Sequence, residues 1–178
     1  MRKLVAVVAV AAVALFLPAS SFAERIGPRL PHDVSHSSGL SDFGTLSLVQ
    51  VRFAGKPMTA PFTGTIKSFG VQNDYGFYGL QVLRRDADGW RVLRSTGGSC
   101  HRNCGDVSRF DANLHIRAGD FIGLKVTGPE SYWSVFERQR LRSRSTTFSP
   151  ALELGSPAQS RGFSERHHLV LYNARLVR

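Results

Sequence analysis

The sequence predicts an all-β protein, a single antiparallel β-sandwich or jelly roll of about seven or eight strands. Several short segments alternate apolar and polar residues with the period of two that is typical of half-buried strands. Turn-forming residues separate these segments at a spacing of about ten residues, which favours a sandwich. No window shows the periodicity of an amphipathic helix, so a helical fold is not expected.

The first residues have the pattern of a secretory signal peptide, expected over residues 1–23. Arg2 and Lys3 precede an apolar run at residues 4–17 that is short for a membrane span. Ser21 and Ala23 are small residues at the two positions that signal peptidase recognises before a cleavage site. We therefore expect cleavage after Ala23, a secreted product and no transmembrane span after cleavage, with a retained anchor as the alternative.

The rest of the chain divides into a lead-in and one domain. Residues 24–43 are rich in Pro, Ser and Gly and have little apolar periodicity, so they predict a flexible lead-in. Residues 44–178 are expected to form the sandwich.

The strands of this domain are expected to begin at residue 45. In residues 45–53 the apolar positions change phase between Leu48 and Val49, which predicts a bulge or burial on both faces. Residues 55–64 contain two prolines and predict a loop. The further strands are expected at residues 65–72, 78–83, 90–95, 110–116, 122–126, 132–137 and 167–177.

The clearest alternation lies in residues 110–126. Residues 118–120 (Ala-Gly-Asp) interrupt it, and Gly119 and Asp120 are residue types that tolerate a positive φ. This predicts a tight turn between two central antiparallel strands. The last run, residues 167–177, is apolar on both faces, as in a central strand.

The composition is basic, with 23 Lys and Arg against 13 Asp and Glu and a formal net charge of +10. About +8 would remain after removal of the two basic residues of the signal. Such a charge favours anionic partners at low salt, for example acidic wall polymers, anionic lipids or glycans, without specificity for nucleic acid. It predicts neither an oligomeric state nor a cofactor.

Cys100 and Cys104 are the only cysteines, and in an exported chain they predict an intrachain disulfide. Two alternatives remain. A metal site of Cys100, His101 and Cys104 lacks a fourth ligand, and a redox pair lacks the Cys-x-x-Cys spacing. No metal is expected.

Four arginines at every second position form the candidate ligand-binding site. If their segment is extended, all four guanidinium groups project from one face, where they suit carboxylate or phosphate groups. The alternative is an ordinary solvated basic loop. The candidate residues are Arg138, Arg140, Arg142 and Arg144.

No catalytic residue is assigned, because the motifs of serine hydrolases, zinc proteases and phosphate-binding loops are missing from the sequence. Asp86, Asp88 and Gly89 resemble the start of a calcium loop, but no acidic ligand follows, so they predict a hairpin turn. These observations favour a non-catalytic binding or surface-associated module. The alternative is a secreted hydrolase of carbohydrate or wall polymer, which requires two close carboxylates or a Ser-His-acid cluster.

Three stretches together resemble a known domain: residues 60–66 (Ala-Pro-Phe-x-Gly-x-Ile), residues 118–124 (Ala-Gly-Asp-Phe-Ile-Gly-Leu), and residues 149–152 (Ser-Pro-Ala-Leu) followed by 169–174 (Leu-Val-Leu-Tyr-Asn-Ala). The sequence resembles a poorly characterised β-sandwich domain of exported actinobacterial proteins. The resemblance implies a β-sandwich and export, and no catalytic residues. In that family acidic Asp- and Gly-rich repeats often follow the last strand. This sequence has none, so the resemblance implies no calcium role.

Overall fold

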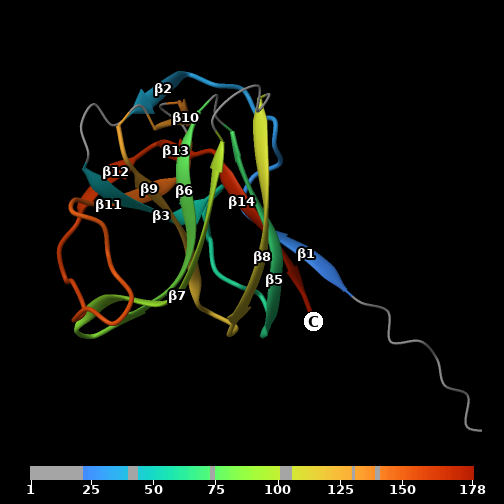
Figure 1. Ribbon diagram of the computed structural model, residues 1–178, viewed down its shortest axis with the longest axis vertical. Coiled ribbons are helices and arrows are strands. Elements are labelled where there is room, and N and C mark those ends of the chain that lie inside the picture. The colour runs from blue at the N-terminus through green and yellow to red at the C-terminus, as the bar shows by residue number, and fades with distance from the viewer. Residues whose placement is uncertain (1–21, 40–43, 73–74, 101–105, 130, 139–140) are drawn as a thin grey trace, which may run out of the picture.

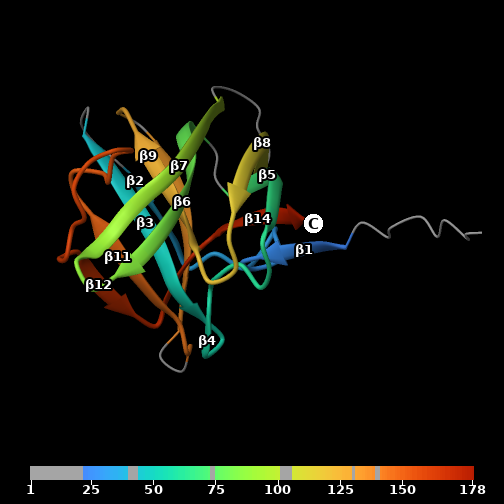
Figure 2. The same cartoon turned by 90° about the horizontal axis from the view of Figure 1, so that it is seen from below.

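Antiparallel strands account for most of the chain in the computed structural model, which describes residues 22–39, 44–72, 75–100, 106–129, 131–138 and 141–178. The strands form two facing layers, as Figures 1 and 2 show. The all-β, antiparallel sandwich expected from the sequence is confirmed. The strands are more numerous than expected, because several are only two to four residues long and too short to show alternation.

The first layer holds two sheets. The four-stranded sheet has the order β1 (Ala23–Ile26), β14 (Tyr172–Val177), β5 (Gly64–Gln72) and β8 (Val107–Ile116). The three-stranded sheet has the order β13 (His168–Val170), β10 (Tyr132–Glu137) and β2 (His36–Gly39).

The second layer is one seven-stranded sheet. Its order is β12 (Phe163–Arg166), β11 (Arg144–Phe148), β3 (Thr45–Phe53), β9 (Phe121–Thr127), β6 (Gly76–Asp86) and β7 (Gly89–Cys100), and β4 (Lys56–Pro57) pairs with β3.

The main core lies between the layers. Ile66 and Tyr172 reach it from the first layer, and Leu80 and Leu124 from the second, all without exposed surface. Burial of apolar side chains from both sheets is the main force that holds the layers together.

A second apolar cluster covers the outer face of the seven-stranded sheet. It includes Val49, Trp90 and Phe148, and the chain between β11 and β12 lies over it through isolated bridges to β7. Leu48 belongs to the main core and Val49 to this second cluster. The phase change in β3 therefore reflects burial on both faces, one of the two predicted explanations.

The turn at residues 118–120 does not form the expected hairpin. β8 pairs with β5 and lies at the edge of its sheet, whereas β9 pairs with β3 and β6 in the other layer. The turn therefore passes from one layer to the other, with Gly119 at φ 86°. Both strands direct apolar side chains into the same core. Their alternation of apolar and polar residues is therefore the same whether they form a hairpin in one sheet or lie in different layers.

The C-terminal run is two strands rather than one. β13 pairs with β10, and β14 pairs with β1 and β5, with Leu171 between the two strands. One continuous apolar run thus serves both sheets of the first layer, and only β14 is a central strand.

The structure places β2 and most of β1 within residues 24–43, the expected lead-in. Ile26 is only 3% exposed, and Asn173 donates a hydrogen bond of 2.8 Å to the carbonyl of Pro28. Gln72 and the backbone of His32 exchange two hydrogen bonds of 2.7 Å. Local composition did not indicate these partners, because all of them lie far away in the sequence.

Residues 1–21 of the expected signal peptide lie outside the described part of the chain, so the signal and its cleavage site stay predictions. Among the residues that are described, no helix has the length and apolar character needed to cross a membrane.

Candidate anion-binding site

The candidate arginines that the structure describes do not all lie in one strand. The N–H of Leu141 donates to the carbonyl of Arg138 over 2.8 Å. Arg142 is exposed, and its carbonyl accepts a hydrogen bond of 2.7 Å from Gly55. Arg140 lies outside the described residues. Of the other three, only Arg144 lies in a strand, β11, and their role in binding stays a prediction.

The side chain of Arg144 lines a small pocket on the outer face of the seven-stranded sheet. Its volume is about 90 Å³, well below the roughly 300 Å³ and more of sites for whole small molecules. The lining residues are Val51, Arg85, Trp90, Arg144, Thr146, Ser160, Gly162 and Ser164.

The β6–β7 hairpin provides the second cation of this pocket. Arg85 and Trp90 are directly opposite each other in the hairpin, and the guanidinium carbon lies 5.5 Å from the centre of the indole ring. Trp90 is 4% exposed and packs edge-on against Phe121 and Phe148. A fixed aromatic ring thus orients Arg85 through a cation–π contact.

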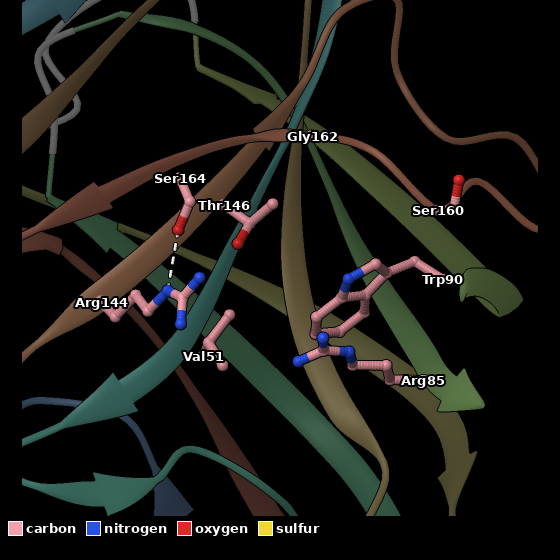
Figure 3. A pocket seen from close by; sticks show the side chains of 8 residues that line it. All are labelled: Val51, Arg85, Trp90, Arg144, Thr146, Ser160, Gly162 and Ser164. Carbon is pink, nitrogen blue, oxygen red and sulfur yellow. Dashed lines mark hydrogen bonds between the residues drawn. The ribbon is translucent and has the colours of Figure 1, made fainter. Parts of the chain in front are cut away.

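Arg144 is oriented by hydrogen bonding. Its Nε donates to the Ser164 hydroxyl over 2.8 Å, and this hydroxyl donates to the carbonyl of Ser145 over 3.2 Å. Figure 3 shows the Arg85 side chain along the Trp90 ring and the Arg144 guanidinium on the other side of Val51. The two cations therefore face a common space.

Positive charge is concentrated around this space. The strand register places Arg144 opposite Arg52 of β3 and Arg166 of β12. Like charges in such cross-strand positions repel one another. Within the described part of the chain, neither Arg85 nor Arg144 forms an ion pair with a carboxylate. The two guanidinium groups and the hydroxyls of Thr146 and Ser164 therefore suit a small oxyanion group.

A second pocket, of about 300 Å³, carries acid–base groups. Those groups are His36, Glu137, Glu165 and His168. His168 is only 6% exposed, and this burial lowers its pKa. The carboxylates of Glu165 and Glu137 raise the pKa of His168, and His36 lowers it. Burial has the largest effect, so the neutral imidazole is favoured.

This pocket does not hold a catalytic triad. The Ser145 hydroxyl lies 3.0 Å and a Glu165 oxygen 3.4 Å from the same nitrogen of His168, Nδ1. In a triad the serine and the acid contact different ring nitrogens. Ser145 is also completely buried, so a substrate could not reach its hydroxyl.

The remaining sequence predictions have mixed outcomes. Asp86 accepts a hydrogen bond of 3.1 Å from the N–H of Asp88 and so forms the expected turn of the β6–β7 hairpin. Cys104 and the side chain of Cys100 lie outside the described residues, so the disulfide stays a prediction. In the described ranges no group of three or more His, Cys, Asp or Glu side chains could hold a metal ion.

Sequence reasoning missed Arg85 and Trp90 as site residues, although a usable signal was present. A hairpin centred on residues 86–89 places residue 85 opposite residue 90, so the cation–π pair follows from the predicted turn. The positions of Ser164 and Arg166 depend on pairing between β11 and β12 and had no such signal. No protein-family model and no curated protein matches this chain.

Proposed function

We propose that this protein is an exported, non-catalytic binding module that holds anionic groups of an extracellular polymer or glycan between Arg85 and Arg144. The observation that carries the proposal is the convergence of two guanidinium groups with no described carboxylate partner on a pocket lined by a fixed indole. Both cations have defined orientations before any ligand arrives, so little conformational entropy is lost on binding.

The size and setting of the pocket define the ligand class. A cavity of about 90 Å³ fits one sulfate, phosphate or carboxylate group, not the sugar that carries it. Arg52 and Arg166 extend the positive potential along the neighbouring strands. A polymer with repeated charges benefits from both features, because one charged group enters the pocket while its neighbours remain in the field.

The proposed compartment rests on the N-terminal pattern of Arg2, Lys3 and the apolar run at residues 4–17. The net charge of +10 is consistent with binding to anionic polymers outside the cell.

A heparin column tests the pocket. The double variant Arg85→Gln/Arg144→Gln should elute at clearly lower salt than the parent. Its affinity should fall at least about tenfold, because two charge-assisted contacts are lost. Arg138→Gln/Arg142→Gln removes the same charge outside the pocket and should shift elution much less. If the two double variants behave alike, only net charge matters and the proposed pocket is wrong.

The hydrolase remains a second candidate because Glu137 and Glu165 line one pocket. A pair of carboxylates is what hydrolysis of a glycosidic bond requires. Release of reducing ends from wall polysaccharide by the parent, but not by Glu137→Gln or Glu165→Gln, would replace the binding proposal. No release by the parent would remove this candidate.

A further inference from the structure

A larger basic groove lies on the outer face of the four-stranded sheet, in the other layer from the pocket of Arg85 and Arg144. Its volume is about 390 Å³, which is within the range of small-molecule sites. Four of its lining residues are arginines from three strands and one connecting segment: Arg25, Arg29, Arg109 and Arg175.

The strand register brings these arginines together. Arg25 of β1 is directly opposite Arg175 of β14, and both alternate with core residues, so they project outward. Residues opposite each other in an antiparallel pair have Cβ atoms about 5 Å apart. Arg109 of β8 projects from the same face, opposite Gly70 of β5, which is in turn opposite Asn173 of β14.

Gly70 lets two side chains that line the groove pack closely over the backbone of β5. A Cβ atom at Gly70 would lie 3.1 Å from the Asn173 Oδ1 and 3.5 Å from Leu30. A side chain at position 70 would therefore press against Asn173 and Leu30 and disturb the wall of the groove.

Two sets of hydrogen bonds fix the remaining wall, which carries Arg29. Asn173 holds the carbonyl of Pro28 at 2.8 Å. Gln72 exchanges two hydrogen bonds of 2.7 Å with the backbone of His32. Arg29 lies between these two anchors, so its backbone is attached to the sheet on both sides.

The charges of the groove are not balanced by the protein. Among the residues that the structure describes, none of the four arginines forms an ion pair. Asp111 of β8 is opposite Ser68 of β5, which is in turn opposite Arg175 of β14, and the Asp111 side chain is exposed. One carboxylate against four guanidinium groups leaves a strong local excess of positive charge, and the direct pair of Arg25 and Arg175 is repulsive.

From this geometry we infer a second binding site, for a compact oxyanion with more than one negative charge, such as a phosphomonoester or diphosphate group. A multiply charged group would neutralise the arginines of β1, β14 and β8 together and relieve their repulsion. Planar guanidinium groups approaching from several strands match the oxygens of a tetrahedral phosphate. This site is independent of the proposed function, because it uses other residues on another sheet.

Isothermal titration with pyrophosphate on the whole protein tests the site. Pyrophosphate should bind saturably, and Arg109→Gln/Arg175→Gln should weaken its tightest binding step at least about tenfold. A matched control, Arg94→Gln/Arg117→Gln, loses the same charge elsewhere on the protein and should bind as the parent does. Equal weakening in the groove variant and its control, or no saturable binding by the parent, would overturn the inference.

Vesicles distinguish a lipid headgroup from a soluble phosphate compound. Phosphatidylcholine vesicles with phosphatidic acid should capture the parent if the groove accepts a headgroup at a membrane surface. Binding of pyrophosphate without capture by these vesicles assigns the site to soluble phosphate groups.

Folding of the variant is checked by its thermal midpoint. Arg109→Gln/Arg175→Gln should melt no lower than the parent, because it removes a repulsive pair. Pyrophosphate should raise the midpoint of the parent more than that of this variant, since a ligand stabilises only the state that binds it. A midpoint that rises equally in both would contradict the groove as the binding site.

Discussion

Gln50 has no exposed surface, yet its side chain connects three strands. Its amide nitrogen donates to the carbonyls of Arg52, Arg144 and His168 over 2.9 to 3.1 Å, and its amide oxygen accepts the N–H of Val170 at 2.9 Å. At the same residue the backbone N–H donates to the Tyr172 hydroxyl, whose pKa is raised by burial. A buried amide with partners on all sides specifies the register between β3, β11 and β13.

Replacement of this amide should be costly. Gln50→Leu has nearly the same volume but leaves buried carbonyls and one N–H without partners, so it should destabilise the fold by about 2–4 kcal/mol. The thermal midpoint should fall by about 5–15 °C, and calorimetry would measure it.

Gln81→Leu is the matched control for this change. Gln81 is also buried, but its side chain connects to fewer partners: it accepts a hydrogen bond from the Ser47 hydroxyl and donates one to the carbonyl of Leu152. An equal loss in the two variants would mean that Gln50 has no special role.

His168 should make stability depend on pH. Burial lowers its pKa in the folded state relative to the unfolded value of about 6.5. The unfolded chain therefore binds more protons at acidic pH, and stability is lost as the pH falls below about 6.5. The other titratable groups facing it are His36, Glu137 and Glu165.

Denaturant unfolding between pH 7 and pH 5 measures this contribution. His168→Asn keeps a hydrogen-bonding group near Ser145 but cannot titrate, so its stability should change less with pH than that of the parent. Loss of the ring also removes packing and lowers stability at every pH. The slope of stability with pH is therefore the quantity that reports on the titration of His168. Identical pH slopes would place the acid sensitivity elsewhere.

At the scale of elements, the turn between β8 and β9 depends on one carboxylate. Asp120 is 3% exposed and accepts hydrogen bonds from Arg84 Nε at 2.8 Å, Arg84 Nη2 at 3.0 Å and the N–H of Arg117 at 3.2 Å. Its own carbonyl accepts the N–H of Ala60 at 2.8 Å. The side chain thus connects the turn to β6, and the backbone connects it to the chain after β4.

Asp120→Ala should therefore loosen the crossing between the layers. Arg84 is 39% exposed at its side chain, so water compensates part of the lost ion pair, and we expect a cost of about 2 kcal/mol. Chemical denaturation would measure it. Asp88→Ala, in the exposed β6–β7 turn, should cost less than about 0.5 kcal/mol. A comparable cost at both positions would remove the structural role of Asp120.

The elements also show what local sequence can and cannot predict. The bounds of β3 and β10 follow from alternation, because each strand is half-buried or covered on both faces. The pairing of β8 and β9 does not follow, since the same pattern serves a hairpin and a crossing between layers. β1 and β2 were missed because their partners, β14 and β10, lie far along the chain.

At the scale of the whole molecule, the two basic sites lie on the outer faces of opposite layers. The pocket of Arg85 and Arg144 belongs to the seven-stranded sheet, and the groove of Arg25 and Arg175 to the four-stranded sheet. Neither could be found from spacing along the chain, because each combines residues that are distant in sequence. Only Arg144 was among the four candidates that spacing suggested.

Sites on opposite faces should allow one molecule to bridge two anionic surfaces. The parent should retain vesicles that carry phosphatidic acid on a heparin-coated surface. Arg85→Gln/Arg144→Gln and Arg109→Gln/Arg175→Gln should each abolish retention, because each loses one of the two attachments while the other persists. Surface plasmon resonance would measure it. Retention by both double variants as strong as by the parent would contradict bridging.

The place of β14 between β1 and β5 has a consequence for the order of folding. β1, near the beginning of the chain, has β14 as its neighbour in the sheet, and β14 is formed by residues 172–177. A ribosome makes these residues after the other strands that the structure describes, so the four-stranded sheet cannot close before they have been made. Pairings between such distant segments also form slowly, because a long loop must be closed first. The four-stranded sheet thus stays open, with one face of the main core uncovered, until residues 172–177 are available to pair.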